Sequence, residues 1–171
     1  MWNILRQTLR VGVLTEAAPE PDETLRVEAQ TIGQELLRIL GRALTIRAVD
    51  AGSCNGCELE MQALGNPYYN LEGLGIQFVA SPRHADMLLV TGPVSRNMEA
   101  ALRRTFEATP APKLVVALGD CGCTGGIFGE SYATCGRVSN VIPVDVAVPG
   151  CPPAPIDILR GILTAVQHRQ P

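Results

Sequence analysis

Cysteines are the residues in this sequence whose spacing is best suited to chemistry. Cys54 and Cys57 are separated only by Asn-Gly, so both thiols can turn toward one metal centre. Cys121 and Cys151 each lie next to a glycine, and Pro152 stiffens the chain after the second of them. Iron–sulfur clusters are held by cysteine thiolates, commonly four for a [4Fe–4S] centre. These residues therefore indicate one [4Fe–4S] cluster with four cysteine ligands.

Other uses of these thiols stay open from the residues alone. A zinc site would also account for four cysteines, although zinc sites usually pair two Cys-x-x-Cys motifs, whereas Cys121 and Cys151 are single. A thioredoxin-like redox pair at 54–57 would leave those two cysteines without a role. Cys123 and Cys135 are expected to be free buried thiols. Cys123 competes with Cys121 as a ligand, and we favour Cys121 because it directly follows a predicted strand.

Strands alternating with helices must position these cysteines. Apolar runs predict strands at 44–49, 76–80, 87–90 and 113–118, and another within 141–148. Helical spacing predicts helices at 22–40, 58–64, 97–108 and 155–168, with an ordered loop at 122–140. This alternation is typical of an α/β parallel sheet covered on both faces. Because the carboxyl ends of parallel strands share one edge, the thiols that follow these strands are expected to converge there.

The chain is expected to form a single domain at 22–171, preceded by an N-terminal arm at 1–21. The arm has apolar residues at helical spacing with arginines between them, namely Trp2, Leu5, Leu9, Arg6 and Arg10. Such a helix either packs on its own domain or is an amphipathic arm that contacts a membrane subunit or lipid headgroups.

Composition and charge exclude several classes of protein. The net charge of −3 gives no electrostatic basis for binding nucleic acid. No apolar run approaches the roughly 18–20 residues that span a bilayer, and the N-terminus lacks the features of a signal peptide. Six cysteines without an export signal are better explained by metal or redox chemistry than by disulfides. We therefore expect a cytoplasmic protein.

Three segments of the sequence, 54–57, 119–128 and 142–153, resemble two related groups of proteins. One is the small subunit of energy-converting, membrane-bound [NiFe] hydrogenases, including formate hydrogenlyase and CO-linked types. The other is the homologous cluster-carrying 20 kDa subunit of respiratory complex I. The resemblance implies a flavodoxin-like fold, and it implies that Cys54, Cys57, Cys121 and Cys151 bind the proximal [4Fe–4S] cluster. Since the sequence ends soon after its last predicted helix, one cluster is expected.

The resemblance also implies partners and a location. A large subunit would carry the nickel–iron centre, a ferredoxin-like subunit would supply or accept electrons, and membrane subunits would move ions. The expected function is electron transfer between an iron–sulfur chain and the nickel–iron site for H2/proton interconversion, at the cytoplasmic face of the cell membrane. Glu58 and Glu60 follow the first motif, as acids do in the hydrogenase-like members. They are assigned to a proton route or the subunit interface, with an ordinary solvated or capping role as the alternative for Glu60.

The spacer between the first two cysteines separates the two groups. Complex I subunits typically carry two adjacent cysteines there, whereas Asn55 and Gly56 lie between Cys54 and Cys57, as in the hydrogenases. The alternative is a complex I-like NADH/quinone oxidoreductase subunit whose cluster reduces quinone. A flavin-binding flavodoxin homologue is less consistent with the sequence, because aromatic residues are few and thiols occupy the strand ends.

Overall fold

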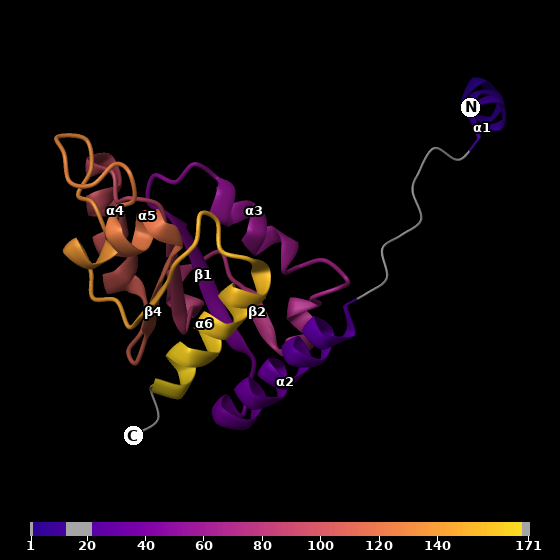
Figure 1. Ribbon diagram of the computed structural model, residues 1–171. Coiled ribbons are helices and arrows are strands. Elements are labelled where there is room, and N and C mark those ends of the chain that lie inside the picture. The colour runs from indigo at the N-terminus through magenta and orange to yellow at the C-terminus, as the bar shows by residue number, and fades with distance from the viewer. Residues whose placement is uncertain (1, 13–21, 169–171) are drawn as a thin grey trace.

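A parallel sheet of five strands forms the centre of the protein, in the order β2-β1-β3-β4-β5 (Figure 1). The computed structural model describes residues 2–12 and 22–168. The strands are β1 (Leu44–Asp50), β2 (Ile76–Phe78), β3 (Met87–Thr91), β4 (Leu114–Leu118) and β5 (Val146–Val148). This strand order is that of flavodoxin-like sheets. The predicted α/β class with a parallel sheet is confirmed.

Six α-helices accompany the sheet in the described part of the chain. They are α1 (Trp2–Val11), α2 (Glu23–Leu40), α3 (Gly56–Ala63), α4 (Arg96–Ala108), α5 (Gly119–Thr124) and α6 (Pro155–His168). Short 3₁₀ turns lie at Leu71–Leu74, Pro82–His84 and Val138–Asn140. Among these residues, no helix is both long enough and apolar enough to cross a bilayer.

Two sequence expectations need correction. The ordered loop expected at 122–140 in fact begins inside α5 and contains a 3₁₀ turn near its end. The sequence of α5 is Gly-Asp-Cys-Gly-Cys-Thr, which has no apolar periodicity that could reveal a helix. The second strand was expected to run to Ala80 but ends at Phe78, because only Leu44, Thr45 and Ile46 of β1 pair with it.

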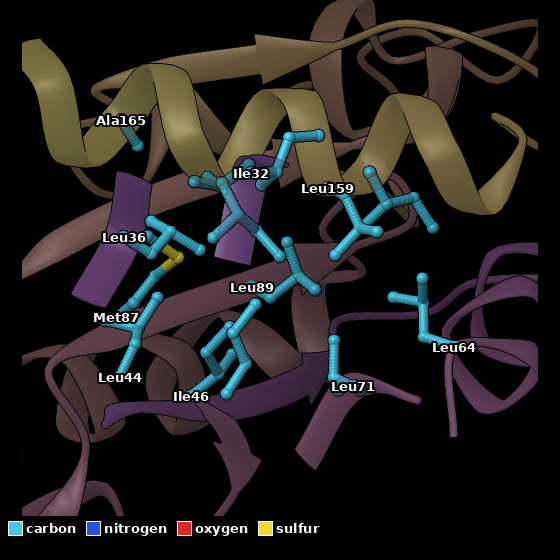
Figure 2. Packing of buried hydrophobic residues seen from close by; sticks show 14 of the residues in the cluster. Ile32, Leu36, Leu44, Ile46, Leu64, Leu71, Met87, Leu89, Leu159 and Ala165 are labelled. Atoms are coloured by element: carbon cyan, nitrogen blue, oxygen red, sulfur yellow. The ribbon is translucent and has the colours of Figure 1, made fainter. Parts of the chain in front are cut away.

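Each face of the sheet has its own core because side chains alternate along a strand. On one face α2 and α6 pack against every second residue of the strands; Figure 2 shows Ile32, Leu36, Leu159 and Ala165 gathered against Leu44, Ile46, Met87 and Leu89. On the other face, α4 and the segment around Val138 cover Leu88, Val90, Val115 and Ala117. Strands β3 and β4 are buried at every position, as expected where helices cover both faces of a parallel sheet.

Polar contacts fix the ends of the helices on the first face. The Asp22 side chain caps α2 by accepting hydrogen bonds from the Thr24 and Leu25 amides, and Gly41 ends the helix in a left-handed conformation. The helix therefore begins and ends where the capping residues predict. Arg160 of α6 makes two hydrogen bonds to the Glu28 carboxylate of α2, at 2.6 and 2.9 Å. This pair ties together the two helices that cover the core.

An acidic residue joins β1 and β3 at the edge opposite their carboxyl ends. Asp86 accepts hydrogen bonds from the Thr45 hydroxyl at 2.8 Å and from Arg42 at 2.5 Å. Partial burial alone would raise the pKa of the Asp86 carboxyl, but the hydrogen bonds from Thr45 and Arg42 outweigh it, so the pKa is lowered. The ionised carboxylate therefore stabilises this end of the sheet.

Candidate metal centre

Four thiols from three strand ends line one cavity at the carboxyl edge of the sheet. Its volume is about 120 Å³, and its lining includes Cys54, Cys57, Cys121 and Cys151. Cys54 and Cys57 follow β1, Cys121 follows β4, and Cys151 follows β5. In Figure 1, α3, α5 and the yellow loop before α6 lie together at this end of the sheet. The structure thus brings together all four cysteines expected from the sequence.

The first pair of thiols is placed by a tight turn after β1. The Asp50 carboxylate accepts hydrogen bonds at 2.8 Å from the amides of Gly52 and Ser53, which turns the chain out of the strand. Asn55 then adopts a left-handed conformation with φ of 71° and starts α3. Asparagine tolerates this conformation better than most residues. The Asn-Gly spacer therefore makes the turn that lets both thiols face the cavity.

Two glycines leave the space that the thiols occupy. A Cβ on Gly119 would lie 2.6 Å from the Cys57 Sγ, and a Cβ on Gly126 would lie 2.9 Å from the Cys121 Sγ. Both glycines have positive φ, at 80° and 55°, which other residues adopt at a cost of roughly 1–2 kcal/mol. The absence of a side chain at these two positions therefore makes room for sulfur.

Asp120 links the third and fourth thiols through the backbone of Gly150. Its Oδ1 accepts a hydrogen bond from the Gly150 amide, and its own amide donates to the Gly150 carbonyl, both at 2.8 Å. Asp120 also lines the cavity. Since Cys121 and Cys151 directly follow these two residues, the reciprocal bonds fix one thiol loop against the other.

The thiols interact electrostatically across the cavity. Burial raises the pKa of the Cys57 thiol to about 12, and negative charge on Glu58 and on the other three cysteines adds to the rise. Burial, then Cys151 and Cys54, also raises the pKa of Cys121. The free thiols Cys57 and Cys121 are therefore protonated at neutral pH, and binding of a metal or cluster must release protons.

The two remaining cysteines lie away from the cavity lining. Cys135 is buried, as expected, and its Sγ lies 3.3 Å from the Glu99 carboxylate. Cys123 is only half-buried, with its Sγ 3.5 Å from the Ala117 carbonyl. Burial raises the pKa of Cys123 to about 11. Of the neighbouring pair in α5, it is Cys121 that faces the cavity with the other three thiols.

The two glutamates after the first motif differ in their surroundings. The Glu58 carboxylate accepts a hydrogen bond from the hydroxyl of the buried Thr91 at the end of β3. Its second oxygen is buried and has no hydrogen-bond partner within residues 2–12 and 22–168. Glu60 is half-exposed on α3. His84 and His168 are exposed and lie outside the cavity lining.

Several residues that build the cavity could not be recognised from the sequence. Asp50 and Asp120 are ordinary acids in the sequence, and their partners are backbone amides in turns. The bond between Asp120 and Gly150 joins residues 30 positions apart. The only sequence signal was that each acid directly follows or nearly follows a predicted strand.

Comparison with protein families gives a match over most of the chain. The family described as NADH ubiquinone oxidoreductase, 20 kDa subunit, matches residues 54–165. A membrane-bound hydrogenase subunit of Pyrococcus furiosus is 45% identical over 133 residues, covering 78% of this chain and 80% of that protein. Formate hydrogenlyase subunit 7 of Escherichia coli is 44% identical over 131 residues, covering 77% of this chain but only 51% of that subunit.

Complex I proteins and solved structures are also similar. A subunit of the NADH-quinone oxidoreductase of Desulfovibrio desulfuricans is 45% identical over 124 residues, covering 72% of this chain and 66% of that protein. A chain of the archaeal membrane-bound sulfane sulfur reductase has a TM-score of 0.64 at 31% identity, covering 81% of this chain and 77% of that one. A chain of an NAD⁺-reducing [NiFe]-hydrogenase has a TM-score of 0.58 at 18% identity, over 76% of this chain and 94% of that one, which shows a shared fold.

Proposed function

The chain belongs to the family of the 20 kDa subunit of NADH ubiquinone oxidoreductase, and from that premise we propose that it is the cluster-carrying electron-transfer subunit of a membrane-bound [NiFe] hydrogenase. It is a subunit of an oxidoreductase complex, as its relatives are. In the proposal, Cys54, Cys57, Cys121 and Cys151 hold one [4Fe–4S] cluster. The observation that carries the proposal is the convergence of these thiols on one cavity.

The cavity suits a cluster better than a single zinc ion. Zinc bound by four thiolates at about 2.3 Å leaves no free space between its ligands, whereas these thiols and six other residues line a cavity of about 120 Å³. When bound, a [4Fe–4S] cluster supplies one-electron transfer. The protein contributes four thiolates, and Gly119 and Gly126 leave room for them.

The spacer and the relatives favour a hydrogenase over a quinone reductase. Asn55 and Gly56 keep the first two thiols apart, which is the hydrogenase arrangement implied by the resemblance. Two of the similar proteins carry hydrogenase or formate hydrogenlyase names. We therefore propose a large subunit with a nickel–iron centre as the direct partner, with a ferredoxin-like subunit and ion-moving membrane subunits in the same complex.

Exposed apolar side chains near the cavity support a docking surface for the large subunit. Cys54 and Cys151 are exposed, so a cluster held there lies near the protein surface. Leu59, Ile127, Phe128 and Tyr132 are large, exposed apolar or aromatic side chains on the segments that carry Cys57 and Cys121. Contiguous exposed apolar side chains mark interaction sites, and Ile127 and Phe128 are neighbours in the sequence. A partner seated there would shield the cluster and shorten the path for an electron.

The surroundings of Glu58 support a role for it at this interface more strongly than the surroundings of Glu60 do for Glu60. The half-buried Glu58 side chain contacts Thr91, and its second carboxylate oxygen is buried and without a partner in the described residues. Such an oxygen can accept a proton or a hydrogen bond from a partner subunit. We propose Glu58 as the acid of the proton route or interface, in a complex attached peripherally to the cytoplasmic face of the membrane.

Anaerobic purification with analysis of iron, acid-labile sulfide, zinc and nickel tests the proposal. We expect about four iron and four sulfide per chain and a reduced-cluster EPR signal. Cys54→Ser, Cys57→Ser, Cys121→Ser and Cys151→Ser should each abolish that signal, whereas Cys135→Ser, the matched buried thiol outside the cavity, should leave it intact. Zinc without sulfide would refute the cluster. A co-purified large subunit that holds no nickel would refute the hydrogenase assignment and favour the complex I-like alternative.

A further inference from the structure

Helix α1 separates its apolar and polar side chains onto opposite halves. At 3.6 residues per turn, the apolar half holds Trp2, Ile4, Leu5, Thr8, Leu9 and Val11, and the polar half holds Asn3, Arg6, Gln7 and Arg10. The hydroxyl of Thr8 donates to the Ile4 carbonyl at 2.9 Å, so it needs no other partner on the apolar half. The helix therefore presents one continuous apolar face.

This apolar face is exposed along its whole length. Trp2 is 79% and Leu9 85% exposed, and Ile4, Leu5 and Val11 are exposed as well. No residue of the helix is buried. By contrast, the exposed apolar residues of α2, Val27 and Leu37, belong to a helix whose other face lies in the core. A contiguous apolar face rimmed by polar residues is a surface for a membrane or a partner.

The charges of α1 favour an anionic surface as the occupant. Two of the 14 basic side chains of the chain and none of its 17 acidic side chains lie in this helix. The helix therefore carries a charge of +2, while the whole chain carries −3. Both arginines lie on the polar half of the helix. They can contact headgroup phosphates there when the apolar half is inserted. Basic amphipathic helices with tryptophan and leucine on the apolar side are typical of the membrane interface.

We propose that α1 lies in the headgroup region of an anionic lipid bilayer, with Trp2, Leu5 and Leu9 inserted and Arg6 and Arg10 paired with lipid phosphates. A single helix of 10 residues gives reversible attachment, because stable anchoring takes two signals. The helix therefore adds a second contact to a subunit that is held in its complex by protein partners. This inference does not depend on the cluster or on the identity of the large subunit.

Binding of the full chain to lipid vesicles tests the proposal directly. Trp2 is the only tryptophan in the sequence, so a blue shift of tryptophan emission reports insertion of α1 alone. We expect the shift, together with co-sedimentation, on vesicles of equal parts phosphatidylcholine and phosphatidylglycerol, and much less on phosphatidylcholine alone. Replacing both arginines, Arg6→Gln with Arg10→Gln, should weaken binding to the anionic vesicles about 30-fold, about fivefold for each arginine. Added salt should weaken it further.

A matched pair of substitutions separates insertion from a general change in charge. Leu9→Glu places a carboxylate on the apolar face and should reduce binding by about tenfold or more. Val27→Glu adds the same charge at an exposed apolar position of α2, which is 57% exposed, and should bind like the unaltered chain. Equal binding to neutral and anionic vesicles, equal loss in both variants, or no binding to any vesicle would overturn the proposal. Capture of α1 by a membrane subunit in detergent, without vesicle binding, would assign the face to protein instead.

Discussion

Two glycines in one loop provide a test that separates backbone strain from obstruction of the cluster site. Gly126 and Gly129 have nearly the same left-handed conformation, with φ of 55° and 53°. A Cβ at Gly126 would lie 2.9 Å from the Cys121 Sγ, whereas a Cβ at Gly129 would meet nothing within 4 Å. Gly126→Ala and Gly129→Ala therefore introduce the same strain, but only the first occupies space that a thiolate needs.

The expected magnitudes differ between the free and the cluster-bound protein. Each substitution should lower the free energy of unfolding of the metal-free chain by roughly 1–2 kcal/mol, because alanine is strained in the left-handed region. In the metal-free chain the Cys121 thiol can rotate away from the new methyl group, but the Cys121 Cα still lies 3.3 Å from it, so Gly126→Ala should cost somewhat more than Gly129→Ala. In the proposed cluster-bound chain, iron would hold the Cys121 sulfur in place. Gly126→Ala should then lose cluster, while Gly129→Ala keeps it.

Urea unfolding of the metal-free proteins and anaerobic reconstitution of both variants measure these effects. The first gives the change in the free energy of unfolding, and the second gives iron and sulfide per chain and the EPR spectrum. Similar stabilities with a lower cluster content only in Gly126→Ala would support the assignment of Cys121. A full cluster with an unchanged spectrum in Gly126→Ala would refute the argument that the Cys121 sulfur is an immobile ligand.

Three further predictions concern a loop, a charge and the core. Asp120→Ala removes the acceptor of the hydrogen bond from the Gly150 amide and should lower the free energy of unfolding by about 1–3 kcal/mol. Asp120→Asn retains an acceptor oxygen and is the matched control. Cluster content after reconstitution should therefore fall mainly in the alanine variant. Asp86 has a lowered pKa, so its ionised form stabilises the fold above the unfolded pKa of about 3.9 and this contribution is lost as pH falls through the folded value. Asp86→Asn should therefore flatten the dependence of urea stability on pH in acid, and an unchanged slope would contradict the assignment. Leu89→Ala, at a fully buried position of β3, should cost about 2–5 kcal/mol in thermal or urea unfolding, and a change below that range would show that the surrounding core collapses around the deletion.

The strands and the grouping of thiols could be predicted because their signals are local. The buried strands β3 and β4 are unbroken apolar runs, and each thiol segment follows a strand in the sequence. Parallel topology then carries Cys54, Cys57 and Cys121 to the same edge as Cys151 without any knowledge of distances. A pattern that depends only on neighbouring residues is enough to place these segments.

The residues that support the thiols could not be predicted, because their contacts lie far away in the sequence or because their segment shows no hydrophobic periodicity. Asp120 contacts the backbone of Gly150, and nothing in the sequence near either residue encodes that approach. Nothing in the sequence distinguishes Gly119 from other loop glycines, because the atom that a Cβ there would approach is the sulfur of the distant Cys57. Helix α5 has no apolar spacing, because Asp120 and Cys121 line the cavity and its other positions hold two glycines, a cysteine and a threonine.

The thiols that line the cavity are distributed over three strand ends, so the cavity depends on the pairing of those strands. Cys151 follows β5, an edge strand that pairs with β4 through only three residue pairs. The cavity therefore forms only after the last strand has joined the sheet. A zinc finger gathers ligands from nearby residues and folds around its metal, whereas the four thiols of this chain come together at the ends of three strands of the folded sheet. A variant that delays closure of the sheet should consequently emerge without a cluster even though every ligand is intact.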